Sequence, residues 1–387
     1  MPPLTGLKVV DLTRVLAGPF CTMMLGDMGA EVLKIEEPEL GDETRGWSPF
    51  IGESSSYFLS VNRNKKSVAL DLKSLAGADA LRELIAKADI LVENFRPGSL
   101  AGLGFGYHDL ATTNPRLIYC SISGYGQNGP RASLPGYDVV IQGESGFMDV
   151  TGSADGEPTR AGVAITDFLA GLYAVQGILL ALYDRQRTGL GQHVDIALFD
   201  SMLSVMRLPL GILQATGSAP GRIGNDHPSI APYETLNLRD GKIIVAVGNP
   251  RLWRQFCDAI ERPDLMTDAR FATNADRVAN RVALKVDLES AFDRFTLDEL
   301  IERLEAYKVP CGRVKTIAEA IADPQVAARN MLPTLFLKGF GEVATLGTPV
   351  KLSRTPAEVS LAPPGLGEHT DEVLEDLDRP LPRIRAR

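Results

Sequence analysis

Short apolar runs alternate with amphipathic segments over the first 125 residues, and this alternation constrains the fold more than any other feature of the chain. The pattern predicts a strand at 7–12 (LKVVDL), a helix at 18–28 and a second strand at 31–36 (EVLKIE). A helix at 76–88 and a strand at 90–93 (ILVE) continue it. Consecutive strands joined by helices run in the same direction, so the sequence predicts an α/β fold with a mostly parallel sheet.

The turns after these strands do not carry a dinucleotide fingerprint. The loop at 13–19 reads TRVLAGP and lacks the glycines of G-x-G-x-x-G. A literal G-x-G-x-x-G occurs at 124–129, but Pro130 and the turn-rich residues after it do not open a helix. We therefore do not expect NAD as a cofactor.

The apolar segment at 161–183, AGVAITDFLAGLYAVQGILLALY, holds a single carboxylate, Asp167. The pattern predicts a helix at 168–183 with Asp167 as its N-cap. The 16 residues between Asp167 and Asp184 would span about 24 Å as a helix, against roughly 30 Å for a membrane core, so a buried core helix is favoured. An acid in a dry site at a helix N-terminus also suits a nucleophile, and capping and catalysis do not exclude each other.

The length of 387 residues and a change in composition predict two domains. Residues 1–215 are expected to form the first part of a large domain, and the Gly- and Pro-rich residues 216–233 a linker. A small α+β domain is expected at 234–330. The tail at 331–387, with a helix near Thr370, is expected to return to the large domain.

Charge and cysteine content argue against several functional classes. A net charge of −9 disfavours nucleic acid and anionic membranes as partners. The four cysteines are far apart in the sequence and form no C-x-x-C motif, so neither a disulfide framework nor a zinc site is indicated, and four scattered histidines do not suggest a metal centre. The first strand-like run begins by Leu7 without a secretory leader before it, and we expect a cytoplasmic protein.

Two loops are candidates for ligand binding. The basic turn at 62–66 contains Arg63, Lys65 and Lys66 and is either an ordinary solvated turn or a cationic lip for phosphates. The loop at 94–98 (NFRPG) leaves the carboxyl end of a predicted strand, where open α/β sheets bind ligands.

Several blocks of the sequence, taken in chain order, resemble the family III CoA-transferases. They extend from Leu4 to about Leu377 and are DLTRVLAGPF, LGDMGAEVLKIE, SVNRNKKSVALDLK, ENFRPG, SGYGQNGP, GYDVVIQ, GVAITDFLAGLYA, TGLGQHVD and LGEHTDEVL. Within the family the chain looks most similar to the succinyl-CoA:glutarate type, which acts on dicarboxylates. The resemblance implies a Rossmann-like large domain and a small domain, with two interlocked subunits in a homodimer. It implies coenzyme A as a substrate held between domains, with no metal and no permanent cofactor.

The resemblance also implies roles for individual positions. Asp167 matches the aspartate that accepts the acyl group, and Tyr137 and Asp138 match a pair that lines the acyl pocket. Gly248 and Asn249 match a mobile loop over the active site. The positions that match coenzyme A contacts are Val15, Leu16, Leu70, Leu72, Lys73, Asn94 and Phe95.

Three departures from the family pattern concern the nucleotide and the substrate. Glu37 and Gly102 stand where many members have arginines near the adenine and the phosphates, which leaves the details of nucleotide binding open. Leu16 replaces a glutamine of formyl-CoA transferases, which argues against oxalate and formyl-CoA as substrates. The distal carboxylate of a dicarboxylate needs its own cation, and Arg45 and Arg160 are candidates, although an ordinary structural role is the simpler interpretation of each.

The implied reaction transfers coenzyme A from an acyl-CoA such as succinyl-CoA to a carboxylic acid, through an aspartyl anhydride and an aspartyl-CoA thioester. The reference pKa of aspartate, about 3.9, predicts that Asp167 is ionised at neutral pH without a general base. An α-methylacyl-CoA racemase of the same fold is one alternative, but Tyr137 and Asn249 stand where racemase-like members carry a histidine and an acid. A non-catalytic acyl-CoA-binding protein is the other, and the retained Asp167 counts against it.

Overall fold

The chain forms two compact units, which are described separately. The structure is a computed structural model that describes residues 1–377. The first unit contains Met1–Ser145, Ala161–Arg207 and the chain from Pro324 onward, and the second contains Gly146–Arg160 and Leu208–Asp323. Residues 378–387, the end of the segment expected to return to the large domain, lie outside the described residues. The predicted domain boundaries stay a prediction.

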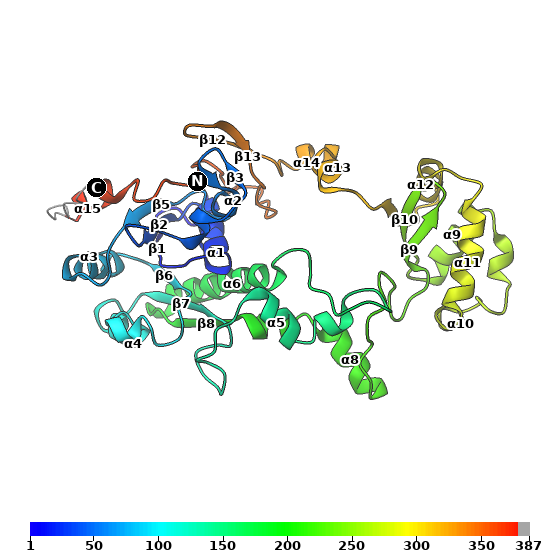
Figure 1. Cartoon of the computed structure of the whole chain (residues 1–387), viewed down its shortest axis with the longest axis horizontal. Helices are drawn as coiled ribbons and strands as arrows, with labels where there is room; N and C mark the ends of the chain where they lie inside the picture. The colour runs from blue at the N-terminus through cyan, green and yellow to red at the C-terminus, as the bar shows by residue number, and fades with distance from the viewer. Residues whose placement is uncertain (378–387) are drawn as a thin grey trace. The chain divides into compact units, whose positions relative to one another are not determined.

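Six parallel strands form the central sheet of the first unit (Figure 1), and the predicted α/β fold with a mostly parallel sheet is confirmed. Their order across the sheet is β5 (Lys66–Ala69), β2 (Glu31–Glu36), β1 (Lys8–Asp11), β6 (Ile90–Glu93), β7 (Ile118–Ser123) and β8 (His193–Ala197). The register places Val10 of β1 between Leu33 of β2 and Leu91 of β6. The chain builds outward from β1 in one direction and then in the other, so the strand order reverses between β1 and β6.

Helices cover both faces of this sheet. One face shares a hydrophobic core with α3 (Leu75–Ala86), α4 (Tyr107–Thr113) and α15 (Thr370–Glu375), and Val10 points into that core. Successive residues of a strand point to opposite faces. Asp11 therefore points to the other face, where its carboxylate accepts a hydrogen bond from Thr22 of α1 (Ala17–Asp27). On that side α6 (Ile165–Thr188) packs against α1, β7 and β8.

α1 and α6 pack closely because a glycine lies at their contact. A Cβ atom on Gly171 would lie 2.8 Å from the carbonyl oxygen of Ala17 and 2.9 Å from a ring carbon of Phe20. Phe20 and Phe168 meet edge to face, with ring centroids 5.0 Å apart. The missing side chain at position 171 therefore sets how closely the first turns of α6 approach α1.

α6 is longer and less buried than the sequence predicted. It extends beyond both ends of the expected helix at 168–183. Its buried residues are Thr166, Ala170, Gly171, Ala174, Ile178, Ala181, Leu182 and Arg185. Leu180 is 62% exposed and Tyr183 64% exposed, so the expected core helix is buried on one face only. Among the described residues α6 alone is long and apolar enough to cross a membrane, which is a weak indication because core helices meet the same criterion.

The end of the described chain packs against β5 at the edge of the sheet. The amide of His369 donates to the carbonyl of Ser67 at 2.9 Å. The amide of Ala69 donates to the hydroxyl of Thr370 at 2.9 Å. α15 begins at Thr370, where the sequence predicted a helix to begin, but its N-cap residue His369 makes no capping side-chain bond.

The second unit has its own antiparallel sheet, in the order β11 (Cys311–Arg313), β10 (Gly241–Ala246) and β9 (Tyr233–Leu238). Its core includes residues of α9 (Pro250–Ala259), α11 (Arg281–Phe292) and α12 (Leu297–Ala306). The remaining elements of the chain are η1 (Glu43–Gly46), β3 (Phe50–Ile51), β4 (Ser54–Ser55), α2 (Ser56–Val61), η2 (Ala101–Leu103), α5 (Asp138–Glu144), η3 (Met148–Val150), α7 (Leu198–Leu203), α8 (Arg207–Thr216), η4 (Pro263–Met266), α10 (Asn274–Ala279), α13 (Ile317–Ile321), α14 (Pro324–Ala328), β12 (Thr334–Leu337) and β13 (Gly341–Ala344).

Candidate active site

Two adjoining cavities open at the carboxyl ends of β1 and β6, where the strand order reverses. Open parallel sheets bind ligands at this position. The Asp167 cavity has a volume of about 210 Å³, and its lining includes Arg14–Ala17, Asn94–Pro97, Tyr137 and Asp167. The leucine cavity has a volume of about 290 Å³, and its lining includes Leu12, Leu70, Leu72, Lys73, Leu100 and Leu103. Arg14 and Phe95 line both cavities, so the two adjoin at this pair of side chains.

Asp167 lies in the first turn of α6, and the prediction that it is the N-cap is wrong. The N-cap residue is Ala164, which has no side chain able to cap, and Asp167 is the third residue of the helix. Within residues 1–377, no hydrogen bond or ion pair engages the Asp167 carboxylate. The Asp167 carboxylate does not cap the helix and instead faces the cavity.

Asp138 caps α6 from a different helix. It is the first residue of α5, and its Oδ1 accepts a hydrogen bond from the amide of Thr166 at 3.0 Å. Its Oδ2 accepts from the side-chain amide of Gln142 at 2.7 Å, and the other atom of that amide, Oε1, accepts from the backbone of Ala161 at 2.8 Å. Asp138 was expected to line the acyl pocket, but it is not among the residues that line the Asp167 cavity. Its carboxylate instead accepts the hydrogen bonds that fix the start of α6.

Burial raises the pKa of Asp167 from 3.8 to about 7, and the negative charge of Asp138 adds to the increase. This direction runs against the expectation of a carboxylate that is ionised at neutral pH as readily as a solvated aspartate. The positive end of the α6 dipole favours the anion but does not offset its burial. A poorly solvated carboxylate with a raised pKa is a suitable nucleophile in its ionised form.

The loops after β1 and β6 are joined to each other beside this carboxylate. The amide of Arg14 donates to Oδ1 of Asn94 at 2.9 Å, and Nδ2 of Asn94 donates to the carbonyl of Arg14 at 2.7 Å. The guanidinium of Arg14 lies over the ring of Phe95, 5.0 Å from its centroid. A cation therefore stands where the two cavities meet. Tyr137, the N-cap residue of α5, is 61% exposed and lies along the Asp167 cavity.

The positions matched to coenzyme A contacts are distributed over the two cavities. Those in the Asp167 cavity are Val15, Leu16, Asn94 and Phe95, and those in the leucine cavity are Leu70, Leu72, Lys73 and again Phe95. Glu37 also lines the leucine cavity, and its carboxylate accepts hydrogen bonds from the backbone amides of Glu39 and Leu40. Gly102 is not among the lining residues of either cavity. The roles of these residues stay predictions.

Arg45, a predicted cation for the substrate, is engaged elsewhere. Its guanidinium binds Glu36 through two hydrogen bonds of 2.8 and 2.7 Å. It also lies over the ring of Phe58, 3.7 Å from the centroid. Because Arg45 is not among the residues lining the Asp167 cavity, this pairing argues against its binding a distal carboxylate.

The basic turn at 62–66 is largely buried and fits neither interpretation offered for it. Arg63 pairs with Asp27 at 2.7 Å, and the two side chains are 3% and 1% exposed. Lys65 pairs with Asp11 at 3.0 Å, and both side chains are fully buried. Arg63 and Lys65 therefore neutralise acids inside the fold and are not free to bind phosphates.

Three predicted site residues, Arg160, Gly248 and Asn249, belong to the second unit, and their relation to Asp167 stays a prediction. Asn249 is the N-cap of α9, where its side chain accepts the amide of Leu252 at 2.9 Å. A Cβ atom added to Gly248 would meet no atom within 4 Å.

Of the charged residues that line the Asp167 cavity, Arg14 and Glu43 were not predicted from the sequence, and Arg96 was predicted only as part of the candidate loop at 94–98. Arg14 and Arg96 follow the two strands that flank the reversal of strand order, so locating that reversal would have found both. No comparable signal marks Glu43, because the position of η1 depends on tertiary contacts.

The fold and the site together define an α/β protein in which the Asp167 carboxylate, unengaged within residues 1–377, lines one of two cavities that adjoin at Arg14 and Phe95. The chain belongs to the CoA-transferase family III, whose family model matches residues 4–370, and it is an enzyme of the CoA-transferase type. The resemblance stated from the sequence is confirmed.

Similar proteins cover nearly the whole chain. A succinate–glutarate CoA-transferase of Agrobacterium fabrum is 41% identical over 97% of this chain and 96% of its own length. An acetyl-CoA:oxalate CoA-transferase of Acetobacter aceti is 46% identical over 91% of this chain and 89% of its own. A human succinyl-CoA:glutarate CoA-transferase is 39% identical over 97% and 86%. The crystal structure of a CAIB/BAIF family protein from Brucella suis has a TM-score of 0.86 at 44% identity and covers 97% of this chain and 100% of that one.

Proposed function

We propose that this CoA-transferase moves coenzyme A from an acyl-CoA donor to a short dicarboxylic acid, with Asp167 as the residue that carries the covalent intermediates. The observation that carries the proposal is an Asp167 carboxylate without a partner among residues 1–377, in a cavity that continues into a second, mostly apolar one. We also propose that the first unit acts as the Rossmann-like part of the enzyme, that the enzyme is a cytoplasmic homodimer, and that it needs neither a metal nor a permanent cofactor.

The two cavities suit the chemistry of coenzyme A. This molecule has an adenine ring at one end, phosphates next to it and a thiol at the far end. The leucine cavity offers apolar walls to a flat ring, as most small-molecule sites do. Lys73 and Arg14 supply positive charge to the leucine cavity. Its lining also includes four acids, of which Glu36 is paired with Arg45 and Asp42 with Lys34, and the other two are Glu37 and Asp71. An acyl-CoA lying through both cavities would place its thioester beside Asp167.

In the first half of the proposed reaction, an Asp167 oxygen attacks the thioester carbonyl carbon of the donor. The C–S bond breaks, the thiolate of coenzyme A leaves with the electron pair, and a mixed anhydride forms on Asp167. The thiolate then attacks the aspartyl carbonyl carbon of this anhydride. The donor acid leaves as its carboxylate, and an aspartyl-CoA thioester remains.

The second half repeats these steps with the acceptor. The acceptor carboxylate attacks the aspartyl thioester, the thiolate leaves, and a second anhydride forms. The thiolate attacks the acceptor's carbonyl carbon, which yields the product acyl-CoA and restores the Asp167 carboxylate. Anhydrides hydrolyse readily, so the site must exclude water during both halves, and the predicted loop at Gly248 and Asn249 would serve as a lid.

Succinyl-CoA as the donor and glutarate as the acceptor are our first choice, because two of the similar enzymes carry these names. The enzyme named for oxalate weakens the argument against oxalate that rests on Leu16, so oxalate is a second candidate acceptor. With Arg45 bound to Glu36, the cations available to a distal carboxylate in the Asp167 cavity are Arg14 and Arg96.

The racemase alternative is less well supported. Racemisation needs two groups that exchange a proton with the α-carbon from opposite sides. No histidine is among the described residues that line the two cavities. A binding protein without turnover would have no use for an unengaged, partly buried carboxylate.

Covalent trapping tests the role of Asp167. Incubation of the enzyme with succinyl-CoA followed by hydroxylamine or borohydride should modify the peptide that contains Asp167, as seen by mass spectrometry. Asp167→Asn should abolish the modification and lower turnover by at least about 1000-fold, the equivalent of roughly 4 kcal/mol. The variant should keep its fold, because Asp167 does not cap α6. Wild-type turnover by this variant would end the proposal.

An acceptor panel tests the substrate class independently of the mechanism. With succinyl-CoA as the donor, glutarate and other short dicarboxylates should exceed monocarboxylates of equal length by at least tenfold in kcat/KM, equivalent to about 1.4 kcal/mol. A preference for monocarboxylates would refute the dicarboxylate assignment and leave the transferase intact.

A further inference from the structure

Val15 has an uncommon backbone conformation beside the Asp167 cavity. Its φ angle is 69°, in the left-handed region that β-branched residues rarely adopt. The residue lies between β1 and α1 and lines the cavity together with Leu16. A strained conformation of this kind persists only where the surroundings impose it, so the groups that hold the Val15 peptide bear on the shape of the cavity.

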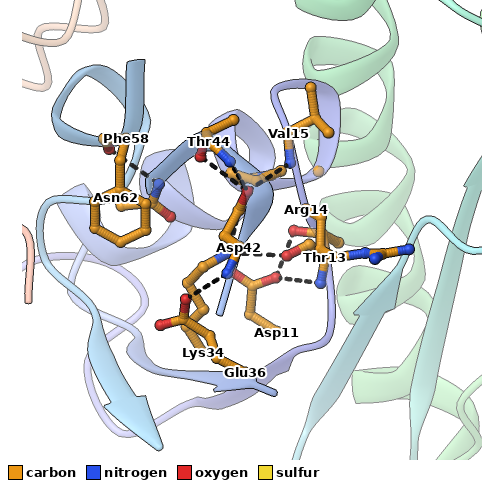
Figure 2. A network of polar contacts seen from close by, with 12 residues as sticks. Asp11, Thr13, Arg14, Val15, Lys34, Glu36, Asp42, Thr44, Phe58 and Asn62 are labelled. Carbon is orange, nitrogen blue, oxygen red and sulfur yellow. Dashed lines mark hydrogen bonds and ion pairs between the residues drawn. The ribbon is translucent and has the colours of Figure 1, made fainter. Parts of the chain in front are cut away.

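Side chains from several segments bind the backbone on both sides of Val15, and Figure 2 shows most of them converging on this loop. The amide of Val15 donates to Oδ1 of Asp42 at 3.3 Å. The ammonium group of Lys34 donates to the carbonyl of Thr13 at 2.8 Å. The further contacts are Asp11 with the amide of Thr13, at 2.9 Å, and Asn94 with both the amide and the carbonyl of Arg14.

Lys34 and Asp42 form a buried ion pair at the centre of these contacts (Figure 2). Nζ and Oδ2 are 2.9 Å apart, and both side chains are 0% exposed. Burial opposes the charge of Lys34, but the carboxylates of Asp11 and Asp42 outweigh it and raise the pKa of the lysine. Burial likewise opposes the charge of Asp42, and Lys34 outweighs it and lowers the pKa of the acid. Both groups are therefore ionised inside the fold.

A buried ion pair is a poor means of stabilising a core, because an apolar pair of similar volume often does as well. Here both members bind the backbone of the loop, one at Thr13 and the other at Val15. The loop also packs closely on α1, because Gly18 has no side chain: a Cβ atom added there would lie 2.3 Å from Cβ of Thr13. The polar contacts and this close packing together restrain the backbone on both sides of Val15.

We propose that Lys34 and Asp42 are positioning residues for the transfer reaction: they hold Val15 in its left-handed conformation and thereby place residues 14–17 as a wall of the Asp167 cavity. This inference rests on the proposed function, because it predicts an effect on turnover at that cavity. It assigns neither residue a contact with the substrate.

A double-mutant cycle between Asp42 and Val15 tests the inference. Asp42→Asn removes the charge that binds Lys34 and weakens the hold on the Val15 amide, so kcat should fall by at least tenfold. Glycine adopts the left-handed conformation without strain. In a Val15→Gly background the loss of kcat caused by Asp42→Asn should therefore be at least threefold smaller than in the wild-type background, because glycine does not need to be held in the left-handed conformation. Losses within threefold of each other in the two backgrounds would overturn the inference.

Two further variants keep this test informative. If Asp42→Asn alone does not fold, Lys34→Met combined with Asp42→Asn removes one positive and one negative charge together, and the cycle is run with that pair under the same criterion. Asp79→Asn, in an exposed pair with Arg82, is the matched control and should leave kcat unchanged relative to each background, wild type or Val15→Gly. Covalent trapping at Asp167 in the wild-type enzyme tests the proposed mechanism, whereas the double-mutant cycle tests the role of Lys34 and Asp42. Failure of the mechanism and failure of this inference are therefore distinguishable.

Discussion

The reactivity of Asp167 is set by its burial and by Asp138, the acid that caps the same helix. Burial contributes most to the raised pKa, and the charge of Asp138 adds to it. Asp138 cannot be moved away to relieve this repulsion, because its two oxygens hold Thr166 and Gln142. One residue thus positions the proposed nucleophile and also raises its pKa.

The rate of aspartyl intermediate formation should therefore depend on pH near neutrality. Only the ionised carboxylate attacks, and the pKa is about 7, so the rate should rise with pH, level off above about pH 8, and fall about tenfold per unit in acid. Asp138→Asn removes a negative charge, lowers the pKa of Asp167 and should shift the profile to lower pH. Single-turnover rates with succinyl-CoA measure both profiles.

The control for this measurement is Asp79→Asn, which alters an exposed acid in α3 and should leave the profile unchanged. A wild-type profile whose midpoint lies near pH 4, the value expected of a solvated aspartate, would contradict the conclusion that burial raises the pKa of Asp167.

At the scale of elements, the contact of α1 with α6 decides where Asp167 lies relative to the loop after β1. The contact is close because Gly171 faces the backbone of Ala17 and the ring of Phe20. Asp167 lies one turn before this glycine on the same helix, so a change in helix separation would also move the carboxylate.

Gly171→Ala should consequently destabilise the protein and slow turnover. Alanine is the better helix former, but its Cβ would lie 2.8 Å from the carbonyl oxygen of Ala17, and overpacking of this kind costs about 1–3 kcal/mol. Gly211→Ala, within α8, is the matched control, because a Cβ there meets nothing within 4 Å. It should leave stability unchanged or raise it by up to about 1 kcal/mol. Denaturant unfolding and steady-state rates compare the two variants, and equal behaviour would exclude the packing argument.

At the scale of the whole molecule, the exposed side of α6 is apolar and is therefore a candidate interface with a partner. Leu172, Leu179, Leu180 and Tyr183 lie along one stripe of the helix, and their exposed fractions range from 43% to 64%. Contiguous apolar surface of this kind marks interaction sites in soluble proteins. It supports the proposed homodimer.

Sedimentation should accordingly give the mass of a dimer at micromolar concentration without detergent. Leu180→Glu should weaken the dimer at least tenfold, since it places a charge in the middle of the stripe. Leu75→Glu is the control, because Leu75 is 84% exposed but lies at the start of α3, away from α6 in sequence and fold. A stable, active wild-type monomer would refute the proposal.

Local patterns in the sequence predicted the parallel sheet, the helices α1, α3, α6 and α15 of the first unit, and the family. The spacing of apolar residues along the sequence distinguishes strands from helices. The sequence blocks that indicate the family occur in the family's order along the chain. The residues matched to coenzyme A contacts also come to the two cavities, because each follows or ends a strand at the same edge of the sheet.

Tertiary structure alone decided the electrostatics of the site. Asp138 caps α6 across 28 positions of sequence, and Lys34 and Asp42 meet inside the fold to hold the backbone of Val15. Arg45, a predicted cation for the substrate, is paired with Glu36, which lies within reach of its guanidinium. The charge state of a carboxylate and the partner of a cation depend on the groups that surround them in space. Neither burial nor the contacts between side chains that the fold brings together leave a periodic signal in the sequence.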